Sequence, residues 1–77
     1  MKLFLLTQDD NRGYDTYDSC VVAAEDAERA KLFSEGYLRS RELYSGWTSI
    51  EGIKAEYLGE AKEGTEESMI LASFNAG

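Results

Sequence analysis

The amino-acid sequence predicts a small α+β fold, in which one principal helix packs on one face of a four-stranded, mostly antiparallel sheet. Nearly unbroken apolar runs lie at 3–6 and 69–74, apolar and polar residues alternate over 53–58, and apolar residues recur at helical spacing from residue 25 onward. Apolar runs are typical of central strands, alternation is typical of half-exposed strands, and a three-to-four-residue period is typical of amphipathic helices. The expected element order is β-β-α-β-β.

The first two strands are expected at 2–7 and 17–24, and a long polar loop joins them into a hairpin. The loop contains Gly13, and the second strand is rich in β-branched and small residues. That strand also carries the single cysteine, Cys20, within an apolar run. We expect a buried free thiol there, with an intermolecular Cys20–Cys20 bridge as the alternative.

The helix is expected to begin at Glu25 and Asp26, whose carboxylates suit the positive end of the helix dipole. One narrow apolar stripe is formed by Ala27, Ala30, Phe33 and Tyr37. Gly36 is predicted to end the helix, because glycine readily adopts the conformation that follows a last helical turn. Glu25 and Arg29 stand four residues apart, which predicts an exposed ion pair.

The segment after the helix has the weakest pattern. Trp47 is expected to fill an edge of the core, and Thr48 with Glu51 matches a capping box that predicts a short helical turn ending at Gly52. The remaining elements are two strands, at 53–58 and 69–74, and the acidic loop between them. Since no linker or repeat interrupts the pattern, residues 1–77 are expected to form a single domain.

The composition argues against most familiar catalytic chemistry. The 77 residues include no histidine and one cysteine, and the formal net charge is −7. Histidine is the usual general base and the commonest metal ligand, so we predict no enzyme, no metal site and no cofactor. The eight basic residues are scattered among acids, which disfavours binding to nucleic-acid phosphates and favours basic protein partners.

The localisation expected from the sequence is cytoplasmic. No apolar run approaches the roughly 20 residues that span a bilayer. The apolar run 3–6 is also too short for the core of a signal peptide.

Residues 9–18, the densest polar segment, are the leading candidate for a protein-contact site. Its candidate contact residues are Asp9, Asp10, Arg12, Tyr14, Asp15, Tyr17 and Asp18. Tyrosines commonly anchor protein interfaces, and the carboxylates would select a basic partner. A solvated hairpin loop would have the same composition. A calcium site on Asp9, Asn11 and Asp15 lacks the EF-hand spacing, because Cys20 stands where that loop needs glutamate.

A second cluster combines basic and aromatic residues. Its members are Arg39, Arg41, Tyr44 and Trp47. Such a cluster could hold a small anionic ligand such as a nucleotide, with the base stacked on an aromatic ring. In the competing interpretation, the aromatic residues complete the core while the arginines pair with Glu35 and Glu42.

Several short segments form a distinctive combination: residues 4–7, 13–15, 17–18, 21–24, 56–61 and 70–77, of which the closing Ala-Ser-Phe-Asn-Ala-Gly is the most specific. Through these segments the chain resembles a group of short acidic proteins from bacteriophages, prophages and their bacterial hosts. This resemblance implies a phage or prophage setting. No activity is established for that group, so the resemblance assigns no functional residue.

These observations predict a non-enzymatic interaction protein that binds a host protein and could inhibit it. One alternative is a homo-oligomer that binds or sequesters a small anionic ligand such as a nucleotide signal. Another is a structural accessory domain whose only site is the interface between its own copies. An enzyme that uses only carboxylates and tyrosine is the least supported class, because no set of catalytic roles can be assembled.

Overall fold

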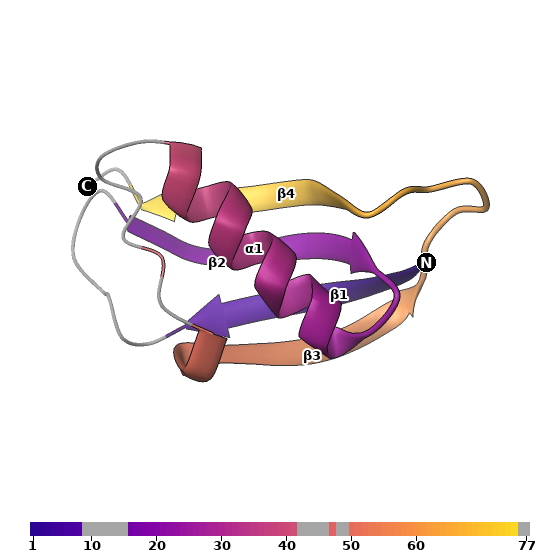
Figure 1. The fold of residues 1–77 in the computed structure, drawn as a ribbon, viewed down its shortest axis with the longest axis horizontal. Helices are drawn as coiled ribbons and strands as arrows, with labels where there is room; N and C mark the ends of the chain where they lie inside the picture. The colour runs from indigo at the N-terminus through magenta and orange to yellow at the C-terminus, as the bar shows by residue number, and fades with distance from the viewer. Residues whose placement is uncertain (9–15, 42–46, 48–49, 76–77) are drawn as a thin grey trace.

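Four strands and one long helix make up the part of the chain that the computed structural model describes, residues 1–8, 16–41, 47 and 50–75 (Figure 1). The elements are β1 (Lys2–Gln8), β2 (Thr16–Ala24), α1 (Ala27–Arg41), the 3-10 turn η1 (Ile50–Gly52), β3 (Ile53–Glu60) and β4 (Ser68–Asn75). The predicted α+β fold and its β-β-α-β-β order are confirmed. Each observed strand lies within two residues of its predicted bounds.

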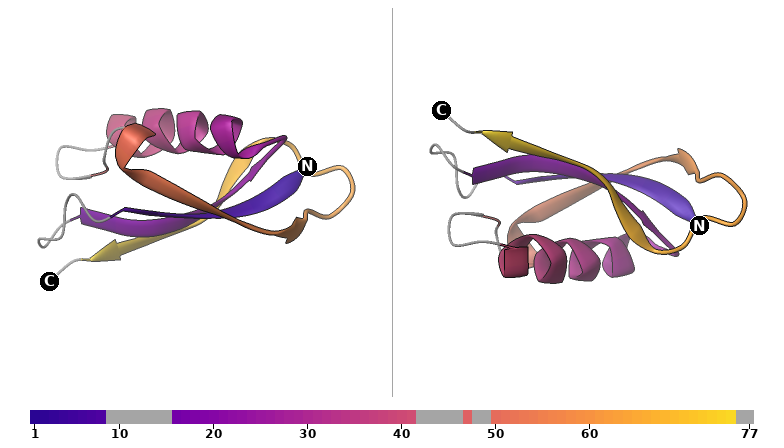
Figure 2. Two further views of the ribbon diagram at one scale, coloured as in Figure 1. Left: turned by 90° about the horizontal axis from the view of Figure 1, so that it is seen from below. Right: turned by 90° about the horizontal axis from the view of Figure 1, so that it is seen from above.

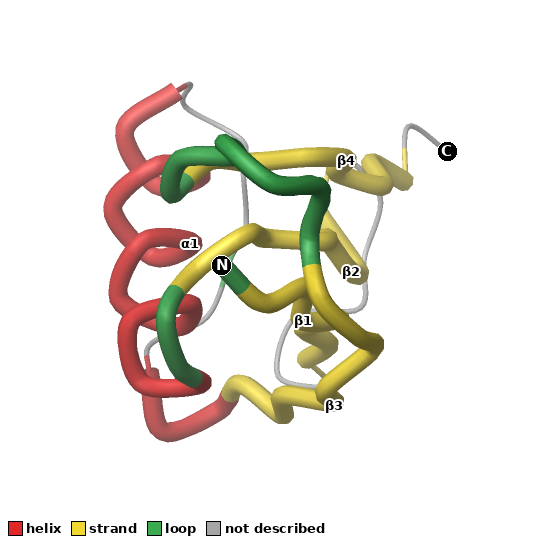
Figure 3. Tube along the Cα trace, turned by 90° about the vertical axis from the view of Figure 1, so that its right-hand side faces the viewer, coloured by secondary structure: helices red, strands yellow, loops and turns green. Residues whose placement is uncertain are grey.

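The strands form one antiparallel sheet in the order β3-β1-β2-β4. β1 is a central strand, as its unbroken apolar run predicts, since it pairs with β2 on one side and β3 on the other. The similar run of β4 predicts a central strand wrongly, because β4 lies at an edge. β3 and β4 therefore lie on opposite edges, and the chain crosses one end of the sheet between them (Figure 3). At the start of this crossing, the Ala61 amide donates a hydrogen bond of 2.9 Å to the Met1 carbonyl oxygen.

The core lies between α1 and one face of the sheet. Figure 2 shows the helix lying along that face. The buried cluster consists of Phe4, Leu6, Cys20, Val22, Ala24, Ala30, Leu38, Trp47 and Ile53. Small side chains at Ala24 and Ala30 let the helix backbone approach the sheet. Cys20 is a buried free thiol, as expected, and its burial raises its pKa to about 12.

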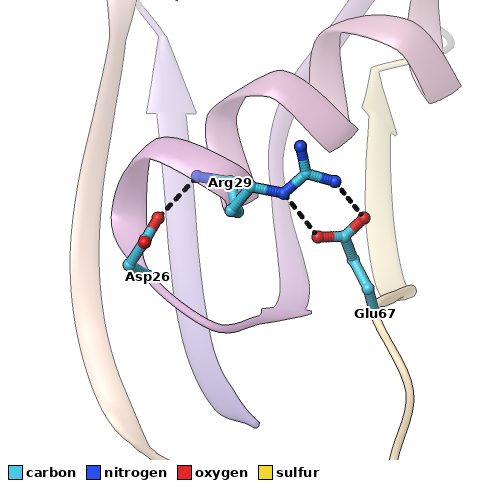
Figure 4. Close-up of polar contacts among 3 residues, drawn as sticks. All are labelled: Asp26, Arg29 and Glu67. Atoms are coloured by element: carbon cyan, nitrogen blue, oxygen red, sulfur yellow. Dashed lines mark hydrogen bonds and ion pairs between the residues drawn. The ribbon is translucent and has the colours of Figure 1, made fainter.

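Asp26 caps the helix, which begins one residue later. The Arg29 amide donates a hydrogen bond of 2.8 Å to Asp26 Oδ1 (Figure 4), which satisfies a backbone donor of the first turn. The prediction that Gly36 ends the helix is wrong, because α1 continues to Arg41. Gly36 is exposed, whereas Leu38 is fully buried one turn after Ser34. Burial of Leu38 outweighs the low helix propensity of one glycine.

The guanidinium of Arg29 binds Glu67 rather than the predicted partner, Glu25. Its Nε and Nη2 donate to the two carboxylate oxygens of Glu67 at 3.2 and 2.9 Å (Figure 4). These bonds raise the pKa of Arg29. The pair joins the first turn of the helix to the segment just before β4, residues that lie 38 positions apart in the sequence. Helical spacing alone could not predict this contact.

Trp47 fills an edge of the core, as predicted. Its indole Nε1 donates a hydrogen bond of 3.2 Å to Ser34 Oγ, and that hydroxyl donates to the Lys31 carbonyl oxygen at 2.9 Å. Trp47 is 4% exposed and Ser34 is 0% exposed. The serine is thus a polar residue within the buried face of α1, and it satisfies the one polar atom of the indole.

Candidate interaction surface

The face of the sheet opposite α1 is the most distinctive surface in the described part of the chain. Both views in Figure 2 show the helix on one side of the sheet only, and no described element covers the other side. Side chains alternate between faces along each strand. Because Phe4, Leu6 and Cys20 point toward the helix, Leu3, Leu5 and Val21 must point to the open face. All three are half-buried.

Three apolar residues on this open face lie side by side across adjacent strands. Leu5 of β1 is opposite Val21 of β2, and Val21 is opposite Leu71 of β4. Directly opposed residues in antiparallel strands place their side chains on the same face, with Cβ atoms about 5 Å apart. Leu5, Val21 and Leu71 therefore form a continuous apolar row, which we call the open-face row. Leu71 is 66% exposed, the largest exposure among the described large apolar residues.

Polar residues border the open-face row. On β3, Glu56 lies opposite Leu5 and extends the row with a carboxylate. The neighbouring row consists of Lys54, Thr7, Ser19 and Ser73. On the other side, the adjacent row contains Leu3 and Ala23 and is apolar. The apolar surface therefore has a polar border on the Thr7 side and at Glu56, and a polar border is common at protein-binding surfaces.

The predicted contact segment 9–18 falls largely outside the described residues. Residues 9–15 lie outside them, and this includes Asp9, Asp10, Arg12, Tyr14 and Asp15. Tyr17 belongs to β2, and the structure describes its backbone only. Asp18 is exposed, and its Oδ1 accepts a hydrogen bond of 3.1 Å from the Ser19 hydroxyl. The segment connects β1 to β2, the two strands that carry Leu5 and Val21.

The basic and aromatic cluster is only partly described. Arg39 and Arg41 lie in the last turn of α1, with backbone positions alone, and Tyr44 is outside the described residues. Trp47 is buried, and Ser34 accepts its indole N–H. The ring would have to leave the core before a nucleotide base could stack on it. The position of Trp47 therefore favours the interpretation in which this aromatic residue completes the core and does not bind a ligand.

Hydrogen bonding shifts the pKa of one further side chain near the sheet edge. Besides Cys20 and Arg29, the hydroxyl of Tyr57 donates a hydrogen bond of 2.6 Å to Glu60 Oε2, which raises the pKa of Tyr57. Burial explains the shift of Cys20, while hydrogen bonds to carboxylates are the main cause for Arg29 and Tyr57. Among the described residues, no three Cys, Asp or Glu side chains gather as potential metal ligands, and no helix is long and apolar enough to cross a membrane.

Comparisons with known proteins add no relative to this picture: no protein-family model matches the chain, and searches of curated proteins and of solved structures found no significant similarity.

Sequence reasoning did not find the open-face row. Leu5 and Val21 lie in apolar runs that also supply the buried face, so their side chains could not be assigned to one face without the register. The available signal was the lack of alternation in 3–6 and 69–74. It fits a sheet with two apolar faces, while the sequence contains only one clear helix to cover them.

Proposed function

We propose that this protein is a non-enzymatic interaction protein that binds another protein through the open face of its sheet. The observation that supports this proposal is the open-face row, Leu5, Val21 and Leu71, which no described element covers. Uncovered apolar patches with polar rims commonly mark protein-binding surfaces.

The partner that fits this surface has an apolar centre and a basic rim. The chain carries a formal net charge of −7. Glu56 stands at the β3 end of the row, and Asp18 is an exposed residue near the start of β2. Opposite charges steer association and align the two surfaces. The proposed setting is a phage or prophage protein that binds a basic host protein in the cytoplasm and could inhibit it.

Tyr14 and Tyr17 keep their place in this proposal as contact residues. The segment 9–18 connects the two strands that contribute Leu5 and Val21, so one partner could contact both the row and the segment. Replacement of Tyr14 and Asp15 together by alanine tests the contribution of the segment separately from that of the row.

The experiment is a comparative capture from bacterial lysate with immobilised wild-type, Leu71→Ser and Leu32→Ser proteins, followed by mass spectrometry. Leu71 and Leu32 are both exposed leucines, at 66% and 44%, but Leu32 lies on α1. The substitution is the same, so a difference in capture reports on the location of the leucine. Each enriched protein is then purified and titrated directly against the wild-type protein and both variants.

We expect one basic protein whose direct affinity falls about tenfold with Leu71→Ser, the loss typical of an interface anchor. Its affinity should stay within about twofold of wild type with Leu32→Ser, and it should weaken as salt rises. Equal binding to both variants would refute the open face as the contact surface. An unrelated acidic protein, immobilised in the same way, serves as a control. If it captures the same set of proteins as the wild type, the proposal as a whole is refuted.

A further inference from the structure

The two edges of the sheet differ sharply in charge. The edge strand β3 carries Lys54, Glu56 and Glu60, whereas Ser68–Asn75, the whole of β4, contains no charged residue. Charged residues make up 30% of the chain, so an uncharged edge strand of eight residues stands out. Charged side chains and prolines are the usual means by which proteins keep sheet edges from pairing with other chains. β3 carries such charges, whereas β4 carries none and is interrupted only by the bulge at Ile70.

Within the described part of the chain, no strand pairs with the outer edge of β4. In the described sheet, β2 is the strand that pairs with β4, and this pairing occupies one edge. The other edge presents backbone N–H and C=O groups in an extended segment, which can accept a further strand. From Leu71 to Ser73, β4 pairs with β2 without a register shift. Register shifts lie directly before Leu71, where Ile70 has no partner in β2, and directly after Ser73, so the regular stretch is these three residues.

We propose that β4 pairs antiparallel with β4 of a second copy of this chain, with Leu71 of one copy opposite Leu71 of the other. The four-stranded sheet would become a continuous sheet of eight strands with two-fold symmetry. This inference goes beyond the proposed function, because it concerns backbone pairing along the edge of the sheet, although the Leu71 side chain also belongs to the open-face row.

A second copy is the occupant that fits this edge. Two identical uncharged strands meet without like charges directly opposite each other, which would destabilise the pair. The pairing also joins the two open-face rows: Leu5, Val21 and Leu71 of one copy would continue through Leu71, Val21 and Leu5 of the other. Such an extension adds buried apolar area to a chain of 77 residues, a size at which one core supplies little stability.

The net charge makes the association depend on salt. Each copy carries −7, so the two copies repel each other outside the strand pair. Salt screens this repulsion. The dimer should therefore strengthen as ionic strength rises, which is the opposite of the behaviour proposed for a basic partner on the open face.

The test is the solution mass of the purified full chain by sedimentation equilibrium, at low salt and at about 0.5 M salt. Leu71→Lys places a charge on β4, and Leu58→Lys makes the same change at an exposed leucine of β3. Their exposures, 66% and 48%, allow lysine at either position without loss of core contacts. We expect wild type and Leu58→Lys to have twice the monomer mass of 8.6 kDa, with a larger fraction of dimer at high salt. Leu71→Lys should have the monomer mass at both salt concentrations.

Three results would overturn the proposal. The first is a wild-type protein that stays monomeric up to about 1 mM, the weak end of specific association. The others are a Leu71→Lys protein that still dimerises, and a Leu58→Lys protein that becomes monomeric while circular dichroism shows it folded.

Cysteine substitution gives a second, independent measurement. Directly opposed residues are close enough for a disulfide, so Leu71→Cys should form a covalent dimer on mild oxidation, and Glu56→Cys on β3 should not. Equal cross-linking of both variants, or of neither, would contradict the proposed pairing.

Discussion

The hydrogen bond between Trp47 and Ser34 gives the sharpest test of how the core is built. Ser34→Ala removes the acceptor of the indole N–H, in a place where Ser34 is 0% and Trp47 is 4% exposed. A buried donor without a partner costs about 2 kcal/mol, and the better helix propensity of alanine returns about 0.5 kcal/mol. The expected loss is about 1.5 kcal/mol, or about 6–12 °C in melting temperature for a domain of this size.

The assay is urea and thermal unfolding followed by circular dichroism. A double-mutant cycle with Trp47→Phe isolates the hydrogen bond, because phenylalanine has no N–H to leave unpaired. In the Trp47→Phe background, Ser34→Ala should cost distinctly less than in the wild-type background. Two results would refute the view that Ser34 stabilises the fold by accepting the indole N–H. One is an equal loss of unfolding free energy in both backgrounds. The other is a wild-type loss below about 0.5 kcal/mol, the usual scatter of surface substitutions.

Three further predictions follow from named contacts. Asp26→Ala should cost about 1 kcal/mol in unfolding free energy while Asp26→Ser costs much less, because serine can still cap the helix; similar losses for both would contradict the capping role. Arg29→Gln should shift the urea midpoint only slightly, and the shift should vanish at high salt, since the pair with Glu67 is exposed; a large, salt-independent shift would be the contrary result. Cys20 should resist thiol reagents in the native state at pH 8 and react with them in urea. Its raised pKa predicts that the free energy of unfolding falls as pH rises from about 9 toward 12, because the unfolded chain loses the thiol proton first. Cys20→Ala should reduce this fall, and an equal fall in the variant would contradict the prediction.

The candidate surface was less predictable from the sequence than the fold was. Composition alone pointed to the segment 9–18 and to Trp47, because polar and aromatic residues there are dense. The open-face row and the uncharged edge depend on which strand lies beside which. Leu5 and Leu71 are 66 positions apart, and only the order β3-β1-β2-β4 brings them to opposite sides of Val21.

Local pattern was sufficient to predict the strands, the start of the helix and the buried position of Trp47, because period and capping act between near neighbours. The sequence by itself also determined the charge, the absence of histidine and the uncharged final strand. Only the tertiary structure decided that α1 continues through Gly36, because burial of Leu38 and Ser34 overrides a local stop. It likewise decided the pairing of Arg29 with Glu67 and the edge position of β4. These features depend on packing and strand order, which join residues that are far apart in the chain.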